Sequence, residues 1–392
     1  MSAVKQNKAL DFMKDYALYF VLLLLLVVII SKDASFLSLT NFSNVLTQSS
    51  VRIIIALGVA GLIVTQGTDL SVGRQVGLAA VISATLLQAV DNVNKVFPDL
   101  GVVPIPMVIL LVCAIGALIG LVNGVIVTVM NVTPFIATLG TMLIIYGVNS
   151  LYYDYVGSAP IAGFDGAYSA FTQGFFDIGG FRLSYITIYA IVAIALMWVI
   201  WNKTRFGKNL FAIGGNPEAA RVSGVNVTLN LIGIYTLSGV FYAFGGLLEA
   251  GRIGSATNNL GFMYEMDAIA ACVIGGVSFS GGVGTVFGVV VGVVIFTLIN
   301  YGLSYIGVNP YWQYIIKGSI IVLAVAIDSL KHAKKNKRFA CLLRGRLKTI
   351  FRFHRRNKGF QTAFIIGGGE IPIHINVGSV TMTARPAWKE AV

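Results

Sequence analysis

The 392-residue chain is 56% hydrophobic and only 11% charged, with a mean hydropathy of +0.82. Because soluble domains carry about 25% charged residues, this composition excludes an ordinary soluble enzyme. The formal net charge is +12, but residues 331–392 hold 14 of the 28 Lys and Arg residues and only two of the 16 acidic residues. The first 330 residues therefore form a neutral, apolar body, and the basic charge belongs to the tail.

Long apolar segments predict an all-α polytopic membrane protein, since a bilayer-spanning helix needs about 20 mostly apolar residues. We expect about ten transmembrane or partly re-entrant helices, at 16–30, 51–66, 76–90, 104–130, 134–151, 183–201, 229–249, 265–278, 284–308 and 311–330. Three of these segments are short enough to be tilted, broken or re-entrant: 51–66, 76–90 and 265–278.

The distribution of Lys and Arg predicts that both termini are cytoplasmic, because cytoplasmic loops are enriched in these residues. The loop at 202–228 carries four basic residues against Glu218 and is expected inside. The loop at 152–182 carries three Asp against Arg182 and is expected outside. The chain then divides into a cytoplasmic N-terminus at 1–15, a permease domain at 16–330 and a basic tail at 331–392.

Glycine recurs every four residues in two of the expected spans, at Gly116, Gly120 and Gly124 and again at Gly284, Gly288 and Gly292. Small residues at this spacing let helix backbones approach closely in lipid. We expect packing within one chain, with a contact between two copies as the alternative.

Two Gly-interrupted stretches, 67–73 and 276–282, share Gly, Ser and Gly at the same relative positions. Each lies between short apolar segments, one in each half of the chain. Such a pair indicates discontinuous helices that line a transport path.

Several kinds of chemistry are excluded by missing motifs. The chain has no Gly-x4-Gly-Lys-Ser/Thr loop, and its first histidine is His332, beyond the apolar body. We therefore expect no catalytic residues, no metal site and no cofactor in this chain. The basic tail lacks interleaved aromatics in a folded context, so we expect it to contact membrane lipid or water rather than nucleic acid.

The loop at 202–228 contains Glu218-Ala219-Ala220, followed four residues later by Gly224. Pro217 suits a first helical turn, Glu218 favours a helix N-terminus, alanine favours helix, and Gly224 can end it. The pattern resembles the EAA loop of ATP-binding-cassette importer permeases, although the Ile-x-Leu-Pro that usually follows is missing. The resemblance implies a short cytoplasmic helix at which an ATPase docks.

Three further segments resemble the signatures of the ribose-type monosaccharide permeases in the same family: 67–73, 133–142 and 264–276. Together with the EAA-like loop they occur in the family's order, and the likeness covers about residues 15–335. Beyond about residue 335 the chain departs from the family. The tail is either a genuine extension or translation past a normal stop, and we expect its deletion to leave transport intact.

The resemblance implies a bacterial inner-membrane permease that works as a homodimer, with a tandem-cassette ATPase subunit and a periplasmic sugar-binding protein as partners. ATP would be used by the ATPase. Overall likeness favours galactose or methyl galactoside as cargo, and therefore a periplasmic galactose-binding protein. Ribose, xylose and arabinose are alternatives, and a secondary sugar carrier is a further one.

Candidate path residues are Asp69, Ser71, Ser280, Asn258 and Asn259. A carboxylate at membrane depth is expensive, so Asp69 either bonds sugar hydroxyls or caps the helix that opens near Ser71. Asn258 and Asn259 either face the path or make a turn.

Four charged residues flank an outward loop at 250–264. We expect them to be solvated, with mutual pairing or docking of the binding protein as alternatives: Glu249, Arg252, Glu265 and Asp267.

Overall fold

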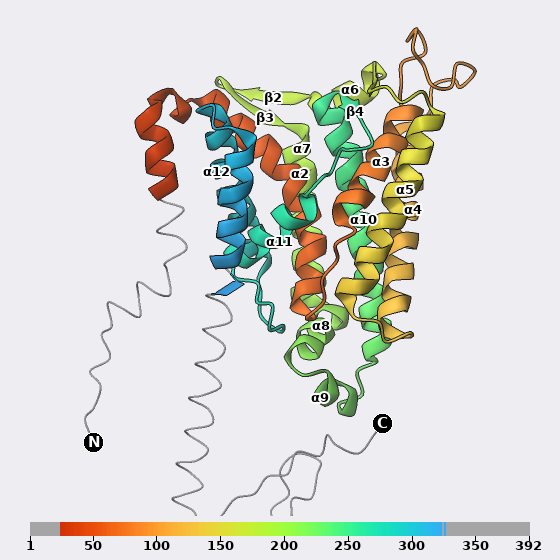
Figure 1. Ribbon diagram of the computed structural model, residues 1–392, viewed down its shortest axis with the longest axis vertical. Helices are drawn as coiled ribbons and strands as arrows, with labels where there is room; N and C mark the ends of the chain where they lie inside the picture. Colours follow the sequence, from red (N-terminus) through yellow and green to blue (C-terminus); the bar gives the residue numbers. More distant parts are fainter. Residues whose placement is uncertain (1–23, 324, 327–392) are drawn as a thin grey trace, which may run out of the picture. The chain divides into compact units, whose positions relative to one another are not determined.

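The computed structural model describes residues 24–323 and 325–326 (Figure 1). The predicted N-terminus at 1–15, part of the span at 16–30 and the tail at 331–392 lie outside the described residues. Within the described part, six helices are long and apolar enough to cross a membrane: α2 (Leu39–Val64), α4 (Ile105–Thr128), α5 (Pro134–Tyr155), α7 (Tyr185–Lys203), α10 (Val227–Ile253) and α12 (Val286–Tyr305).

The remaining expected spans are also helical where the structure describes them. Helices α3 (Val72–Leu86) and α11 (Tyr264–Ile274) are short, and residues 24–32 and 310–323 are helical. The predicted all-α polytopic class is therefore confirmed. The largest difference is at α2, which begins at Leu39 rather than residue 51. The polar groups in its first turns have hydrogen-bond partners, since Ser38 caps the helix and Tyr301 donates to Asn41 Oδ1 at 2.8 Å.

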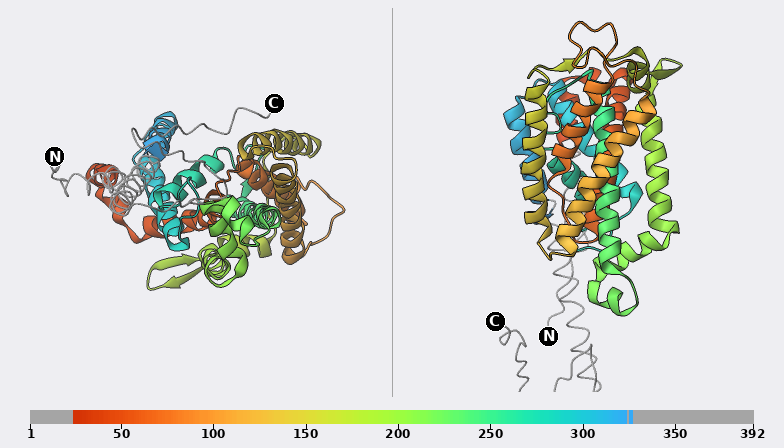
Figure 2. Two further views of the ribbon diagram at one scale, coloured as in Figure 1. Left: turned by 90° about the horizontal axis from the view of Figure 1, so that it is seen from below. Right: turned by 90° about the vertical axis from the view of Figure 1, so that its right-hand side faces the viewer.

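Helices α2 and α10 form the centre of the bundle, while α4 and α5 lie at its edge (Figures 1 and 2). In α2, 83% of the most apolar 18-residue stretch is buried, whereas in α4 and in α5 only 22% of the corresponding stretch is buried. The apolar outer faces of α4 and α5 thus suit contact with lipid.

The regularly spaced glycines pack helices together within the chain, as expected. A Cβ atom at Gly116 would lie 2.2 Å from the carbonyl oxygen of Gly239, so α4 and α10 touch through their backbones. A Cβ atom at Gly292 would lie 2.1 Å from the carbonyl oxygen of Ala271, which joins α12 to α11 in the same way.

Two small layers lie at opposite ends of the bundle (Figure 1). At one end are the 3₁₀ helix η1 (Ala34–Leu37) and α6 (Gly166–Gln173). With them are two antiparallel pairs, β1 (Ile161–Ala162) with β4 (Ser255–Ala256) and β2 (Phe175–Ile178) with β3 (Phe181–Ser184). At the other end, α8 (Arg205–Gly215) and α9 (Pro217–Val222) project beyond the long helices (Figure 2). The loops at 152–182 and 202–228 therefore lie at opposite ends, as the predicted orientation requires.

Both predicted helix breaks are present. Residues 65–71 between α2 and α3 and residues 275–285 between α11 and α12 are not helical. Helix α3 starts partway across the bundle, so residues 65–71 lead from the lower end of α2 into the middle of the bundle (Figure 1). A third non-helical segment, residues 257–263 between β4 and α11, belongs to the outward loop expected at 250–264. The difference is that it packs against α3 rather than staying outside the bundle.

Candidate translocation and coupling site

Asp69 bonds the backbone of Ser71, the N-cap residue of α3, inside the bundle. Asp69 Oδ1 accepts hydrogen bonds from the Ser71 backbone N–H at 2.8 Å and from Ser71 Oγ at 2.5 Å. Both residues are fully buried. A side-chain acceptor here satisfies a backbone donor that the helix leaves unpaired. Capping is thus the role that Asp69 performs in this conformation, and sugar contact by Asp69 stays a prediction.

The cap belongs to a buried polar cluster that ties α3 to α4 and α5. Ser71 Oγ accepts from Gln75 Nε2 at 2.9 Å and from Asn123 Nδ2 at 3.1 Å. Asn123 Oδ1 in turn accepts from Thr141 Oγ1 at 2.6 Å. Such bonds hold helices together in lipid, where the alternative is an unsatisfied polar group. The cluster therefore fixes the position of α3, whose N-terminal end is buried inside the bundle.

The interruption at 257–263 runs along the first two turns of α3. A Cβ atom at Gly73 would lie 2.2 Å from the carbonyl oxygen of Gly261, and one at Gly77 would lie 2.4 Å from that of Leu260. These backbones touch only because both α3 positions are glycine. Asn258 and Asn259 are part of this segment, the first half-buried and the second exposed. The structure thus brings them beside α3, and their role in the path stays a prediction.

Ser280 lies apart from the Asp69 cluster, at the lower end of α2. Its side chain is exposed, and its carbonyl oxygen accepts from Gln66 Nε2 at 2.9 Å. The same Nε2 donates to the carbonyl oxygen of Gly214 at 2.8 Å. Gln66 has a left-handed backbone with φ of 63°, which aims its side chain at both segments. No sequence pattern distinguishes Gln66, so it was missed.

Around Gln66, three distant segments contact each other through their backbones. Gly282 N donates to the carbonyl oxygen of Val64 at 2.8 Å. A Cβ atom at Gly214 would lie 1.8 Å from that same oxygen and 2.5 Å from Gly282 N. We call this contact of α2, α8 and the 275–285 segment the Gln66 junction. It connects both predicted breaks to the α8–α9 pair.

The EAA-like sequence forms the short helix α9, as predicted. Asn216 Oδ1 accepts from the Ala219 N–H at 3.0 Å, and Pro217 occupies the first turn. Gly224 ends the helix with φ of +84°, and Val225 N donates to the Ala220 carbonyl at 3.0 Å. This is the hydrogen-bond pattern of a glycine-terminated helix.

The surface of α9 is free for a partner among the described residues. Glu218 is 77% exposed and pairs with Arg221 at 3.3 Å, while Val222 is 89% exposed. Ala220 is buried against the chain and holds the helix in place. An exposed pair of this kind contributes about 0.5 kcal/mol or less to stability. The geometry suits docking of another protein, and that role stays a prediction.

Three of the four charged residues near the outward loop, Glu249, Arg252 and Asp267, are paired rather than solvated, which corrects the expectation for them. Glu265 is half-buried. Glu249 is only 2% exposed and accepts from Arg252 Nε at 2.8 Å and Tyr264 OH at 2.5 Å. Asp267 is buried and accepts from Lys317 Nζ at 3.0 Å. Ion pairing is favoured here because burying an isolated charge at this depth costs free energy.

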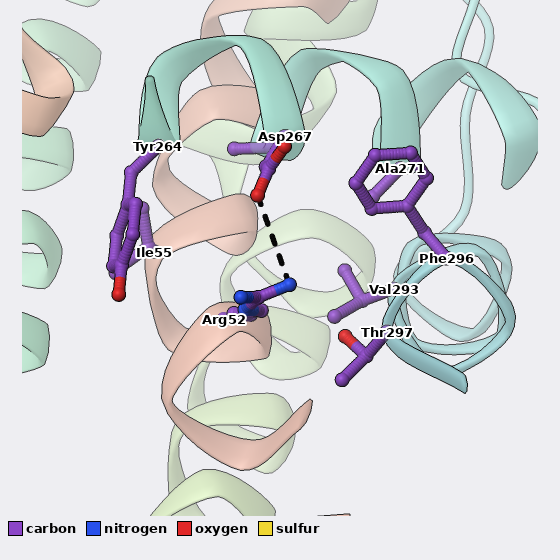
Figure 3. Close-up of a pocket in the computed structure, with 9 residues that line it drawn as sticks. Arg52, Ile55, Tyr264, Asp267, Ala271, Val293, Phe296 and Thr297 are labelled. Carbon is purple, nitrogen blue, oxygen red and sulfur yellow. Dashed lines mark ion pairs between the residues drawn. The ribbon is translucent and has the colours of Figure 1, made fainter. Parts of the chain in front are cut away.

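Asp267 also faces Arg52 across a pocket between α2, α11 and α12 (Figure 3). Arg52 Nη1 lies 3.7 Å from Asp267 Oδ2. The cavity measures about 10 Å³, which is room for about one water molecule and far too little for a sugar. The pocket is therefore a structural ion-pair site in this conformation.

These features define a polytopic transport permease: a glycine-packed helix bundle, interrupted at membrane depth and joined to a projecting capped helix. The profile of the family described as "Branched-chain amino acid transport system / permease component" matches residues 41–325. The chain belongs to this family of membrane permeases.

Named relatives cover most of the chain. The galactose/methyl galactoside import permease proteins MglC of Haemophilus influenzae and Escherichia coli are 74% and 73% identical to it over 335 residues. In each case this is 86% of this chain and 100% of the relative. The ribose import permease protein RbsC of Escherichia coli is 37% identical over 312 residues, 79% of this chain and 92% of the relative. No solved structure matches the chain.

Proposed function

We propose that this chain is the permease subunit of an importer for galactose and methyl galactoside. The carrying observation is its 74% identity to a galactose/methyl galactoside import permease over that protein's full length. A ribose import permease is half as similar, at 37%. Ribose is therefore the weaker candidate cargo.

In the proposed assembly, two copies of the permease lie in a bacterial inner membrane with both termini in the cytoplasm. The end of the bundle that carries α8 and α9 faces the cytoplasm, where a tandem-cassette ATPase subunit binds ATP and docks on α9. The end that carries α6 and the β2–β3 hairpin receives sugar from a periplasmic galactose-binding protein. This chain itself performs no catalytic step and holds no cofactor.

The Gln66 junction supplies a route from the ATPase to the path. Gly214 lies four residues before Glu218 and is in backbone contact with Val64 and Gly282. A shift of α9 would therefore move the lower ends of the 65–71 and 275–285 segments together. Rigid, directly packed elements carry such coupling better than mobile loops. ATP hydrolysis by the partner would thereby alternate access to the interior.

The direct test is reconstitution in vesicles with the cognate ATPase and binding protein. We expect ATP-dependent uptake of D-galactose that exceeds uptake of D-ribose by at least about 10-fold. D-Ribose has one carbon and one hydroxyl group fewer than D-galactose, and the contacts it loses are worth about 1.4 kcal/mol or more. Preference for ribose would contradict the proposed cargo. Galactose uptake that persists without the ATPase would support a secondary carrier instead.

Docking on α9 has its own test. We expect Glu218→Leu and Gly224→Val each to lower ATPase association and transport together, by about 10-fold for a lost contact of about 1.4 kcal/mol. Neither added side chain would meet the bundle, because Glu218 is exposed and no atom lies within 4 Å of a Cβ placed at Gly224. Gly224→Val acts on α9 itself, because valine is strained at the φ of +84° that ends the helix. Association equal to that of the unmodified permease would show that the ATPase docks elsewhere.

A further inference from the structure

A group of half-buried and exposed polar and aromatic side chains lies at the first turn of α3. The guanidinium carbon of Arg74 lies 4.2 Å from the ring centroid of Tyr146 and 5.5 Å from that of Phe262. Tyr146 is 39% exposed, Phe262 is 48% exposed, and Asn259, three residues before Phe262, is exposed. Glu265 adds a carboxylate, with Oε2 2.4 Å from the position of a Cβ at Gly73. We call these five residues the Arg74 face.

The Arg74 face is assembled from four separate elements at membrane depth. Arg74 is in the first turn of α3, which starts partway across the bundle, and Tyr146 is on α5 (Figure 1). Asn259 and Phe262 belong to the 257–263 interruption, and Glu265 is in the first turn of α11. The close backbone contact between Gly73 and Gly261 holds these elements in register. The face is therefore built by the helix breaks themselves.

This face is unsuited to lipid. Irregular backbone at membrane depth is tolerated only where it is buried in protein or borders water. Among the described residues, no carboxylate lies within ion-pair distance of Arg74, and its buried Nη1 has no hydrogen-bond partner. A guanidinium without a carboxylate partner at this depth indicates an aqueous neighbour.

We propose that the Arg74 face is the sugar-contacting wall of the path, where an uncharged hexose binds in transit. This inference rests on the proposed function. A hexose presents apolar C–H groups that pack on aromatic rings such as Phe262 and Tyr146, and hydroxyls that both donate and accept. Arg74 donates to hydroxyl oxygens, Glu265 accepts from hydroxyl groups, and Asn259 does both.

Asp69 has a different part in this arrangement. It is fully buried and bonds Ser71, the residue that starts α3. It therefore positions the turn that carries Arg74 and does not itself meet the sugar. The pocket between Arg52 and Asp267 is not part of the proposed sugar wall, because its charges are paired and its volume is too small for a sugar.

The first experiment asks whether water reaches the face. Asn259→Cys and Leu110→Cys are reacted, in the complete importer, with a charged, membrane-impermeant maleimide, and the unmodified protein supplies the background from native cysteines. Leu110 is a matched control because it is 74% exposed on the apolar outer side of α4. Thiols react as thiolates, which form in water and not in hydrocarbon. We expect rapid labelling at position 259 and background labelling at position 110. Background labelling at both positions would overturn the inference.

The second experiment asks whether the Arg74 face binds sugar during transport. We expect Phe262→Ala, Tyr146→Ala and Arg74→Gln each to lower the efficiency of galactose uptake by about 10-fold, the effect of one lost stacking or hydrogen-bonding contact of about 1.4 kcal/mol. ATPase association should be unchanged. Phe262→Trp should restore uptake, because it returns an aromatic surface, whereas a merely structural loss would not be rescued by a larger ring.

The outcomes separate this inference from the proposed function. If the unmodified importer transports galactose and all three variants stay within about twofold of it, the face is not the sugar wall. If the unmodified importer does not transport galactose, the proposed cargo is wrong. The labelling result at position 259 then still reports whether the face borders water, since it needs no sugar.

Discussion

Helix α9 and the helix breaks are held together in opposite ways. Helix α9 depends on local bonds, such as Asn216 to Ala219 and Val225 to Ala220. The breaks depend on contacts between distant residues, such as Gln66 with Ser280, 214 positions apart, and Ser71 with Asn123, 52 positions apart. A docking element can therefore keep its shape while it moves, whereas the breaks change only when distant segments shift relative to one another.

The strongest test of this contrast is at the closest approach of two breaks. Gly73→Val would place side-chain atoms against the carbonyl of Gly261, and neither backbone can withdraw without moving α3 or the 257–263 segment. We expect destabilisation of about 3 kcal/mol, at the upper end for overpacking, and loss of transport. The measurement is the thermal midpoint in detergent together with galactose uptake at equal membrane levels.

Gly140→Ala is the matched control, because no atom lies within 4 Å of a Cβ at Gly140. It should leave the thermal midpoint unchanged. Equal behaviour of the two variants would show that the contact between α3 and the 257–263 segment does not hold the fold.

The next largest effect is expected at the Gln66 junction. Gly214→Ala forces α8 away from Val64 and Gly282, which should lower uptake by about 10-fold for a strain of about 1.4 kcal/mol while α9 still binds the ATPase. The neighbouring Gly215→Ala has no atom within 4 Å of the new Cβ and should transport normally. Loss of ATPase association in Gly214→Ala alone would instead mean that the junction shapes the docking site.

A smaller effect is expected at the cap of α3. Asp69→Ala removes the acceptor for two hydrogen bonds from Ser71 and should destabilise the protein by about 1–2 kcal/mol. Asp69→Asn keeps an acceptor oxygen and should behave nearly as the unmodified protein. Thermal midpoints and uptake check both variants. Uptake lost in Asp69→Asn at unchanged stability would show that the carboxylate contacts the sugar after all.

The smallest effect is expected at Ser280. Only its carbonyl oxygen contacts Gln66, and its side chain is exposed. Ser280→Ala should therefore keep uptake within about twofold of the unmodified importer. A larger loss would support the original prediction that this side chain lines the path.

Much of the fold could be predicted from the sequence, because its signals are local. Apolar length located the spans, and Pro217, Glu218 and Gly224 predicted α9. Glycine-rich stretches at 67–73 and 276–282 predicted both breaks. The start of α2 was misplaced because its polar first turns are satisfied by a distant residue, Tyr301.

The site was predicted less completely, because its residues meet through long-range packing. The likeness of 67–73 to 276–282 suggested that Asp69 and Ser280 share one path, yet the segment that meets α3 is 257–263. Gln66 and Arg74 have no local pattern that marks them. The charges at Glu249 and Asp267 were expected to be solvated because the fold, and not the sequence, shows how deeply they are buried. Arg252 is only three residues from Glu249, whereas Lys317 is 50 residues from Asp267.

The central claim is that α9 drives both helix breaks through the Gln66 junction. The most direct measurement is the number of galactose molecules imported per ATP hydrolysed by the reconstituted importer with Gln66→Ala. Gln173→Ala is the control, since its Nε2 also donates to a backbone carbonyl, that of Gly251, at 2.7 Å. With two hydrogen bonds lost, each worth about 1 kcal/mol, we expect the ratio to fall by about 10-fold in Gln66→Ala while ATP hydrolysis continues. An unchanged ratio would contradict the account.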